Sequence, residues 1–263
     1  MFDLTGQVAI VTGGSRGLGK QMALALAGAG ADLAICARNA VELEAARAEI
    51  AGETGREALA LPLDVTDSSA VNDFVSAVLA QFGHVEILIN NAGAGLRRPL
   101  LDLSDDDWRR VTQVCLDAPF FVARAVAPAM IAAGYGRIVN ISSSLGAVAL
   151  PERGPYCAAK GGLLQLTRVM ALEWARSGLT VNAICPGPFK TPYNLRLQDN
   201  PALFESYLNL IPQHRWGELS EIRAAALFLA SREASFVTGT ALYVDGGWTA
   251  HGGLPMDGAT DPR

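Results

Sequence analysis

Three side chains that could move a proton at an alcohol or a ketone lie between positions 143 and 160. Tyr156 and Lys160 are four residues apart, a spacing that places both on one face of a helix, about one turn from each other. A free phenol is a poor base at neutral pH, but a neighbouring ammonium stabilises the phenolate. Together with the Ser143 hydroxyl, these groups suit general acid–base chemistry. The Tyr156–Lys160 spacing alone is also common on ordinary solvated helix faces.

A strand and a turn must bring the three groups together. The apolar run Gly136–Ile141 is predicted to be a buried strand that ends just before Ser143. A turn after it can return the hydroxyl to a helix that holds Tyr156 and continues to about Arg176.

Strands and helices alternate along the rest of the chain, which predicts an α/β fold with one doubly wound parallel sheet. The domain covers residues 1–250, and 251–263 form a loose tail. The other strands are predicted at 7–12, 32–37, 58–63, 87–89, 179–184 and 241–245, and the other helices at 20–28, 41–52, 68–82, 105–133 and 220–229. Pro119 and Pro128 predict a kink or a break in the helix 105–133.

A glycine-rich turn joins the first strand to the first helix. It contains Gly13, Ser15, Arg16, Gly17, Leu18 and Gly19. Such a turn lets a phosphate approach the backbone at a helix N-terminus, so it favours a dinucleotide site. A plain tight turn is the alternative, but the strand before and the helix after favour the cofactor.

The end of the second strand indicates which dinucleotide. Folds of this kind often place an acid there for the adenosine ribose hydroxyls. This chain has Ala37 followed by Arg38, with Arg16 in the glycine-rich turn. Two guanidinium groups without a carboxylate favour a 2′-phosphate. We therefore expect NADP(H), with NAD(H) as the alternative if both arginines are ordinary surface residues.

Composition limits the other classes of function. The chain has 263 residues, 50% of them hydrophobic, and a net charge of −5 without a long basic run. Nucleic acid is therefore not an expected partner. No secretory signal and no apolar run of membrane-spanning length are expected. The four cysteines are widely spaced and suggest reduced thiols in a cytoplasmic protein, with no metal site.

Taken together, the motifs resemble the short-chain dehydrogenase/reductase family over about residues 3–250. The resemblance is carried by 12–19, Asp64, 90–93, Ser143, Tyr156, Lys160, 186–187, Thr191 and 245–247. It implies a Rossmann fold, hydride transfer at the nicotinamide, a small-molecule substrate and a homotetramer. The opening residues of the chain and the stretch after 90–93 are similar to gluconate 5-dehydrogenase-like members of the family. The other subgroup considered is that of the 3-oxoacyl-[acyl-carrier-protein] reductases.

The resemblance also implies roles for individual residues. Tyr156 would be the acid/base, Ser143 would hold the carbonyl oxygen, and Lys160 would bind the nicotinamide ribose and tune the tyrosine. The implied cofactor-binding residues are Gly13, Ser15, Arg16, Gly17, Leu18, Gly19, Arg38, Asp64, Val65, Asn90, Ala92, Gly93, Tyr156, Lys160, Pro186, Gly187 and Thr191.

One position departs from the family pattern. The family has a fourth catalytic residue, an asparagine, on the long helix, and this chain has Cys115 there. A thiol lacks the paired groups of an amide. The substitution keeps open a second function, a cofactor-binding sensor or scaffold with weakened catalysis.

The substrate is less clearly indicated. Arg97 and Arg98 could pair with the carboxylate of a sugar acid or keto acid, or they could be surface residues. A segment at about 190–215, with Phe204, Tyr207 and Ile211 at roughly helical spacing, is interpreted as a lid, with an ordinary surface helix pair as the alternative. Its apolar character instead suits a 3-oxoacyl thioester or a hydrophobic ketone.

Overall fold

The computed structural model describes residues 2–195 and 199–250. Within these residues, seven strands form one parallel sheet in the order β3-β2-β1-β4-β5-β6-β7, which confirms the predicted doubly wound fold. The strands are β1 (Val8–Thr12), β2 (Asp32–Ala37), β3 (Ala58–Pro62), β4 (Ile87–Asn90), β5 (Gly136–Ile141), β6 (Leu179–Pro186) and β7 (Ala241–Val244).

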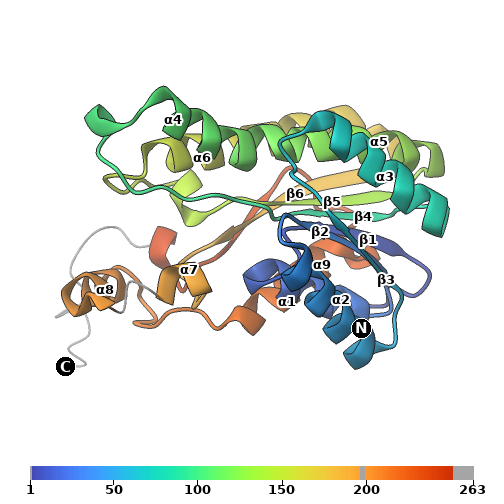
Figure 1. Ribbon diagram of the computed structural model, residues 1–263, viewed down its shortest axis with the longest axis horizontal. Helices are drawn as coiled ribbons and strands as arrows, with labels where there is room; N and C mark the ends of the chain where they lie inside the picture. The colour runs from blue at the N-terminus through green and yellow to red at the C-terminus, as the bar shows by residue number, and fades with distance from the viewer. Residues whose placement is uncertain (1, 196–198, 251–263) are drawn as a thin grey trace.

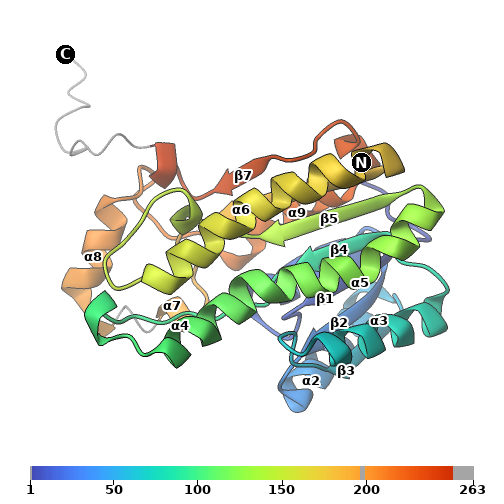
Figure 2. The same cartoon turned by 90° about the horizontal axis from the view of Figure 1, so that it is seen from above.

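Helices cover both faces of the sheet (Figures 1 and 2). On one face lie α1 (Gly17–Gly28), α2 (Ala40–Thr54) and α9 (Arg223–Ala230), and on the other lie α3 (Ser68–Phe82), α5 (Ala118–Ala133) and α6 (Gly154–Trp174). Three further helices, α4 (Asp105–Thr112), α7 (Pro192–Leu195) and α8 (Pro201–Asn209), extend past the carboxyl ends of the strands (Figure 1).

The inner strands β1, β4, β5 and β6 are buried on both faces, because their side chains meet a helix layer in either direction, whereas the edge strands β3 and β7 are half-buried. In β1, Ala9 and Val11 belong to the core cluster with α1 and α9, whereas Val8 and Ile10 belong to the cluster with α3, α5 and α6. This alternation explains why the sequence shows continuous apolar runs there and not a polar–apolar pattern.

Local signals fix the helix ends where the sequence is explicit. The side chain of Asp67 accepts hydrogen bonds from the backbone N–H groups of Ser69 (2.9 Å) and Ala70 (3.1 Å) at the start of α3. Gly83 ends the helix in the left-handed region, at φ +83°. The predicted bounds 68–82 are therefore confirmed.

The long apolar helix differs from expectation in two ways. No break occurs at Pro119 or Pro128; α4 and α5 are joined by a π-helical turn, Gln113–Asp117. The stretch Asp105–Ala133 is also long and apolar enough to cross a membrane, against the expectation from sequence. It packs against α3, β4 and β5 and buries Val122, Val126 and Met130. In the described chain it is a core helix.

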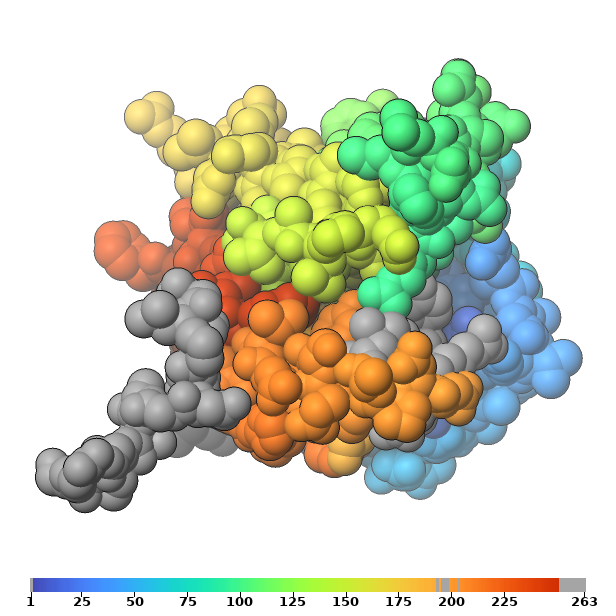
Figure 3. Space-filling model, turned by 90° about the vertical axis from the view of Figure 1, so that its left-hand side faces the viewer, coloured from blue at the N-terminus to red at the C-terminus, as the bar shows by residue number. Residues whose placement is uncertain are grey.

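The segment predicted as a lid forms α7 and α8, and residues 196–198 lie outside the described part. Tyr207, Ile211 and Trp216 form a small apolar cluster, against which Leu150 and Trp248 pack. In Figure 3, the orange α8 region lies directly below the yellow-green loop that precedes α6. Whether the segment moves stays a prediction. The predicted tail, 251–263, also lies outside the described residues.

Candidate active site

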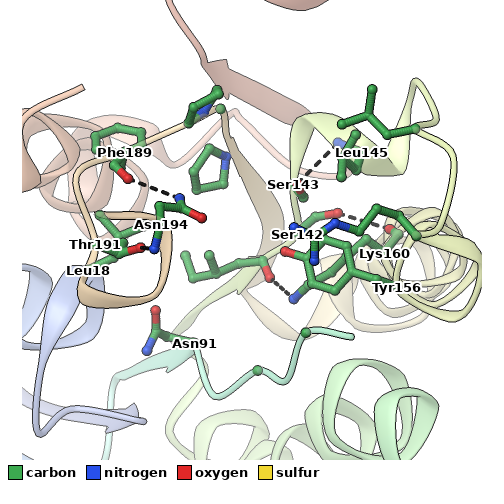
Figure 4. A pocket seen from close by; sticks show the side chains of 18 of the residues that line it. Leu18, Asn91, Ser142, Ser143, Leu145, Tyr156, Lys160, Phe189, Thr191 and Asn194 are labelled. Carbon is green, nitrogen blue, oxygen red and sulfur yellow. Dashed lines mark hydrogen bonds between the residues drawn. The ribbon is translucent and has the colours of Figure 1, made fainter. Parts of the chain in front are cut away.

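Ser143, Tyr156 and Lys160 line one cavity of about 350 Å³. Ser143 follows β5 and starts a tight 3₁₀ turn, in which its Oγ accepts a hydrogen bond from the N–H of Leu145 (3.1 Å). In Figure 4, Ser143 and Tyr156 lie on one side of the pocket, and Thr191 and Asn194 lie on the opposite side. The structure therefore brings the hydroxyl, the phenol and the ammonium to the same space.

Lys160 is buried and held by the end of β5. Its Nζ donates to the carbonyl of Ile141 (2.6 Å) and lies 5.7 Å from the centre of the Tyr156 ring. The Ser142 hydroxyl donates to the backbone carbonyl of Lys160 (2.9 Å), which ties α6 to the same strand end. Burial raises the pKa of the nearby Cys185 thiol to about 11, so this thiol stays protonated at neutral pH.

A second cavity of about 460 Å³ adjoins the first along the carboxyl edge of the sheet. The two share Arg16, Asn91, Gly93 and Ala94 in their linings. Together they form an elongated trough at the edge where doubly wound sheets bind dinucleotides. Its shape suits a ligand with two halves joined near Arg16.

The glycine-rich turn is the narrow part of this trough. Gly13 and Ser15 line the second cavity, and Leu18 lines the first. A Cβ on Gly19 would lie 2.2 Å from the carbonyl oxygen of Gly13 and 2.4 Å from Nδ2 of Asn91. Gly19 therefore allows the close approach of helix and turn, and neither Gly19 nor Gly17 belongs to the described linings.

The second cavity carries the groups expected for an adenosine half. Its lining includes Arg38, Asp64, Val65 and Ala92. The backbone N–H and hydroxyl of Thr66 donate to Asp64 and hold the pKa of its carboxyl below the usual range. Asp64 is thus an anionic acceptor at neutral pH.

Three arginines, Arg16, Arg38 and Arg110, line the same cavity together with Glu42, and Ala37 leaves the end of β2 without an acid. This donor set fits a phosphate on the ribose. The carboxylate of Glu42, which lies 3.5 Å from Arg16 in an exposed ion pair, was not identified from the sequence. Glu42 is in the first turn of α2, where an acid is favoured by the helix dipole.

Pro186, Gly187 and Thr191 line the first cavity. Asn194, which the sequence did not single out, donates from its Nδ2 to the carbonyl of Phe189 (3.0 Å) and from its backbone to Thr191 Oγ1 (3.2 Å). These bonds shape the start of α7 around the cavity wall (Figure 4).

Comparison with known proteins agrees with this geometry. A family model described as enoyl-(acyl carrier protein) reductase matches residues 13–249. The chain belongs to the short-chain dehydrogenase/reductase family. Enzymes of this family act on CH–OH groups with NAD(P)⁺, and this chain is such an oxidoreductase.

Individual relatives match over nearly their whole length. The chain is 43% identical to gluconate 5-dehydrogenase of Gluconobacter oxydans, covering 95% of this chain and 97% of that one. It is 41% identical to the L-tagatose-forming galactitol 2-dehydrogenase of Cereibacter sphaeroides, covering 95% and 97%. The crystal structure of gluconate 5-dehydrogenase from Burkholderia cenocepacia, in complex with NADP and tartrate, superposes with a TM-score of 0.91 at 40% identity, covering 95% and 98%.

In this short-chain dehydrogenase/reductase, Asn90 belongs to neither described lining, and its contact with a cofactor stays a prediction. Its side chain is buried and donates to Asn140 Oδ1 (3.0 Å) and to the carbonyl of Pro119 (3.2 Å), which ties β4 to β5 and α5. The next residue, Asn91, lines both cavities and donates to the carbonyls of Thr12 and Gly13. Neighbouring side chains of a strand point to opposite faces of the sheet. The sequence did not show which of the two asparagines would face the cavity.

Cys115, at the family's asparagine position, has a defined set of partners. Its thiol is fully buried, donates to the carbonyl of Ala94 (3.3 Å) and accepts from the N–H of the same residue (3.4 Å). Ala94 lines both cavities. The thiol therefore anchors the loop after β4 to the π-helical turn, which is a contact that the sequence did not suggest.

Arg97 and Arg98, the expected carboxylate partners, do not line either cavity described above. Arg98 pairs with Asp107 on the surface, and Arg97 contacts Glu152 (3.4 Å) and the hydroxyl of Tyr207 (3.2 Å). A different guanidinium, that of Arg153, lines the first cavity. The signal in the sequence that could have pointed to Arg153 is its position three residues before Tyr156.

Proposed function

We propose that this protein is an NADP(H)-dependent dehydrogenase that interconverts a secondary alcohol and a ketone on a sugar acid or a polyol. The observation that carries the proposal is the joining of two cavities, one with Ser143, Tyr156 and Lys160 and the other with Arg16 and Arg38. The named relatives oxidise substrates of this kind, and one of them was crystallised with NADP.

In the proposed reaction, the nicotinamide of the bound cofactor supplies the acceptor or donor of the hydride. Tyr156 takes the proton from the substrate hydroxyl during oxidation and returns it during reduction. The Ser143 hydroxyl hydrogen-bonds the same substrate oxygen and orients it. The ammonium of Lys160, fixed on Ile141, stabilises the phenolate, which is the form of Tyr156 that accepts the proton in oxidation and remains after the proton is given in reduction.

The residues that would hold the cofactor follow the trough. Arg16 and Arg38 would bind the 2′-phosphate, Asp64 and Val65 would flank the adenine, and Thr191 would bind the nicotinamide side. Gly13, Ser15, Leu18, Asn91, Ala92, Gly93, Pro186 and Gly187 would form the walls.

The other functions considered receive less support. A 3-oxoacyl thioester would favour an apolar cavity, and the described lining does include Leu150, Phe189 and Trp216 beside the polar Asn91 and Asn194. The named relatives, which act on sugar acids and polyols, favour the polyhydroxy substrate. A sensor or scaffold has no need of the buried ammonium that Ile141 holds beside the phenol. Both alternatives can be judged in the same assay.

The test is a substrate panel with purified protein and either NADP⁺ or NAD⁺. We expect turnover of aldonic acids or hexitols, and faster turnover with NADP⁺ at low cofactor concentration. Reduction of 3-oxoacyl thioesters without any oxidation of sugar acids or polyols would overturn the proposed substrate class. No turnover with any of the three classes would favour the sensor.

Cofactor preference has a test of its own. Arg38→Asp places an acid where the structure has a guanidinium, and like charges repel a 2′-phosphate. We expect KM for NADP⁺ to rise by about tenfold or more, a loss of ~1.4 kcal/mol, and KM for NAD⁺ to fall. Wild-type turnover that is equal or better with NAD⁺ would contradict the assignment.

A further inference from the structure

We infer that Glu42 competes with the 2′-phosphate of NADP(H) for the guanidinium of Arg16 and thereby weakens the discrimination between NADP(H) and NAD(H). The inference rests on the proposed function, because it requires that the second cavity receives the adenosine half of the cofactor. It assigns a role in cofactor specificity to a residue outside the motifs that identify the family.

The two side chains reach the second cavity from different elements. Arg16 directly precedes α1, and Glu42 lies in the first turn of α2. Nη1 of Arg16 lies 3.5 Å from Oε1 of Glu42, and both residues line the cavity. Among the ion pairs of the described residues, this is the one whose two members both belong to that lining. A ligand that takes Arg16 in this cavity therefore meets Glu42.

The start of α2 holds Glu42 in this position. The side chain of Asn39 caps the helix and accepts hydrogen bonds from the backbone N–H groups of Val41 (3.1 Å) and Glu42 (3.2 Å). The dipole of α2 favours a negative charge in its first turn. The carboxylate therefore belongs to a fixed turn of the cavity wall.

The guanidinium of Arg16 is less restrained. Its side chain is 70% exposed, and within residues 2–195 and 199–250 it has no hydrogen bond or ion pair apart from the one with Glu42. Arg110 differs, because it pairs with Asp107 (3.5 Å), which lies outside the lining. Arg16 can thus turn from the carboxylate to a phosphate without breaking any other described contact.

A phosphate and Glu42 cannot both gain fully from this guanidinium. If Arg16 turns to the phosphate, it leaves the carboxylate without its pair. If Arg16 stays, it holds the phosphate beside a like charge, and like charges repel. In either case Glu42 lowers the affinity for NADP(H). NAD(H) carries a hydroxyl in place of that phosphate, so the competition does not affect it.

The experiment measures Kd for NADPH and for NADH by fluorescence titration of the wild type, Glu42→Gln, Arg16→Gln and the double variant. We expect Glu42→Gln to tighten NADPH binding about three- to tenfold, the effect of one nearby charge in a largely solvated site. Kd for NADH should change by less than about twofold, because NADH has no phosphate there. In the Arg16→Gln background, Glu42→Gln should change Kd for NADPH by less than about twofold, because the shared partner is gone.

Glu44→Gln is the matched control. It removes the same charge from α2, but Glu44 pairs with Arg47 on the surface and does not line the cavity. It should change neither Kd by more than about twofold, since exposed charges far from a ligand are screened. Melting temperatures without cofactor show whether each variant keeps its fold.

The possible outcomes separate the inference from the proposed function. If Arg16→Gln weakens NADPH binding but Glu42→Gln acts no more than Glu44→Gln, the competition is overturned and the proposed function stands. Equal tightening of NADPH and NADH by Glu42→Gln, or equal tightening of NADPH with and without Arg16, would also overturn it. If neither Arg16→Gln nor Arg38→Asp weakens NADPH binding, the proposed phosphate site itself is rejected.

Discussion

Removal of the phenolic hydroxyl of Tyr156 should stop the reaction with little disturbance of the structure. Tyr156→Phe keeps the ring on the cavity wall and removes the proton. We expect kcat to fall by about 10²- to 10⁴-fold, the range of a general acid–base group, while Kd for NADPH stays within about twofold. Steady-state rates and a fluorescence titration with NADPH measure the two effects. Retained turnover would mean that another group transfers the proton.

For Cys115 the sequence suggests weakened catalysis, whereas the structure shows a thiol with two hydrogen-bond contacts. The thiol donates to and accepts from Ala94, and an asparagine amide can make the same two contacts. We therefore expect an active wild type and less than about a tenfold rise in kcat for Cys115→Asn, or ~1.4 kcal/mol.

Cys115→Ala serves as the contrast to this change. It leaves the N–H and carbonyl of Ala94 without the thiol, which should destabilise the loop by ~1–3 kcal/mol and raise KM for NADPH. An inactive wild type that Cys115→Asn switches on would contradict the contacts described and favour decayed catalysis.

How well single residues could be predicted depended on whether their chemistry is local. Tyr156 and Lys160 share a helix, so their spacing alone placed them together. Asn91 and Asn90 differ only in strand register, which is set by neighbouring strands. Arg97 lies beside Glu152, whereas Arg153 lines the first cavity. No sequence spacing encodes which of the two arginines reaches the cavity.

At the level of elements, the turn between β1 and α1 has little free space. A Cβ on Gly19 would lie 2.2 Å from the carbonyl oxygen of Gly13, and backbone cannot yield as a flexible side chain does. We expect Gly19→Ala to destabilise the fold by ~1–3 kcal/mol or more and to weaken NADPH binding. Thermal unfolding and a cofactor titration measure both effects.

Gly28→Ala is the matched control in the same helix, because no atom lies within 4 Å of the added Cβ. It should be neutral or stabilising by ~0.5–1 kcal/mol. If both substitutions have the same effect on stability and cofactor binding, close packing at Gly19 is not the cause of that effect.

Most strands and helices were predictable because buried parallel strands appear in the sequence as apolar runs and helix ends carry capping residues. The join between α4 and α5 was not. Proline predicts a missing hydrogen bond, but Pro119 lies in the first turn of α5, where a helix tolerates it. The change to π-helical hydrogen bonding, in which the N–H of Ala118 donates to Gln113, depends on tertiary packing.

For the whole molecule, we predict a homotetramer, which is what the family resemblance implies. Exposed apolar side chains on α6, Val169 at 49% and Leu172 at 81%, are consistent with an interface between copies. Light scattering at micromolar concentration should give about four times the 27.6 kDa of one chain.

The variant Leu172→Asp tests the surface directly. Because Leu172 makes little contact within the chain, a charge there should leave the fold intact and shift the mass to smaller species. A monomeric wild type would contradict the tetramer, and an unchanged mass for the variant would place the interface elsewhere.

The two cavities share Arg16, Asn91, Gly93 and Ala94 but otherwise differ in the stretches of chain that line them, and this difference affects how new specificities can arise. The second cavity is built from residues between Gly13 and Val114, whereas Tyr207 and Trp216 reach the first cavity from the single connection between β6 and β7. A chimera that exchanges only this connection should therefore acquire the donor's substrate range and keep its own cofactor preference. Recombination, or duplication followed by change in this one connection, would be enough to move such an enzyme from one polyhydroxy compound to another.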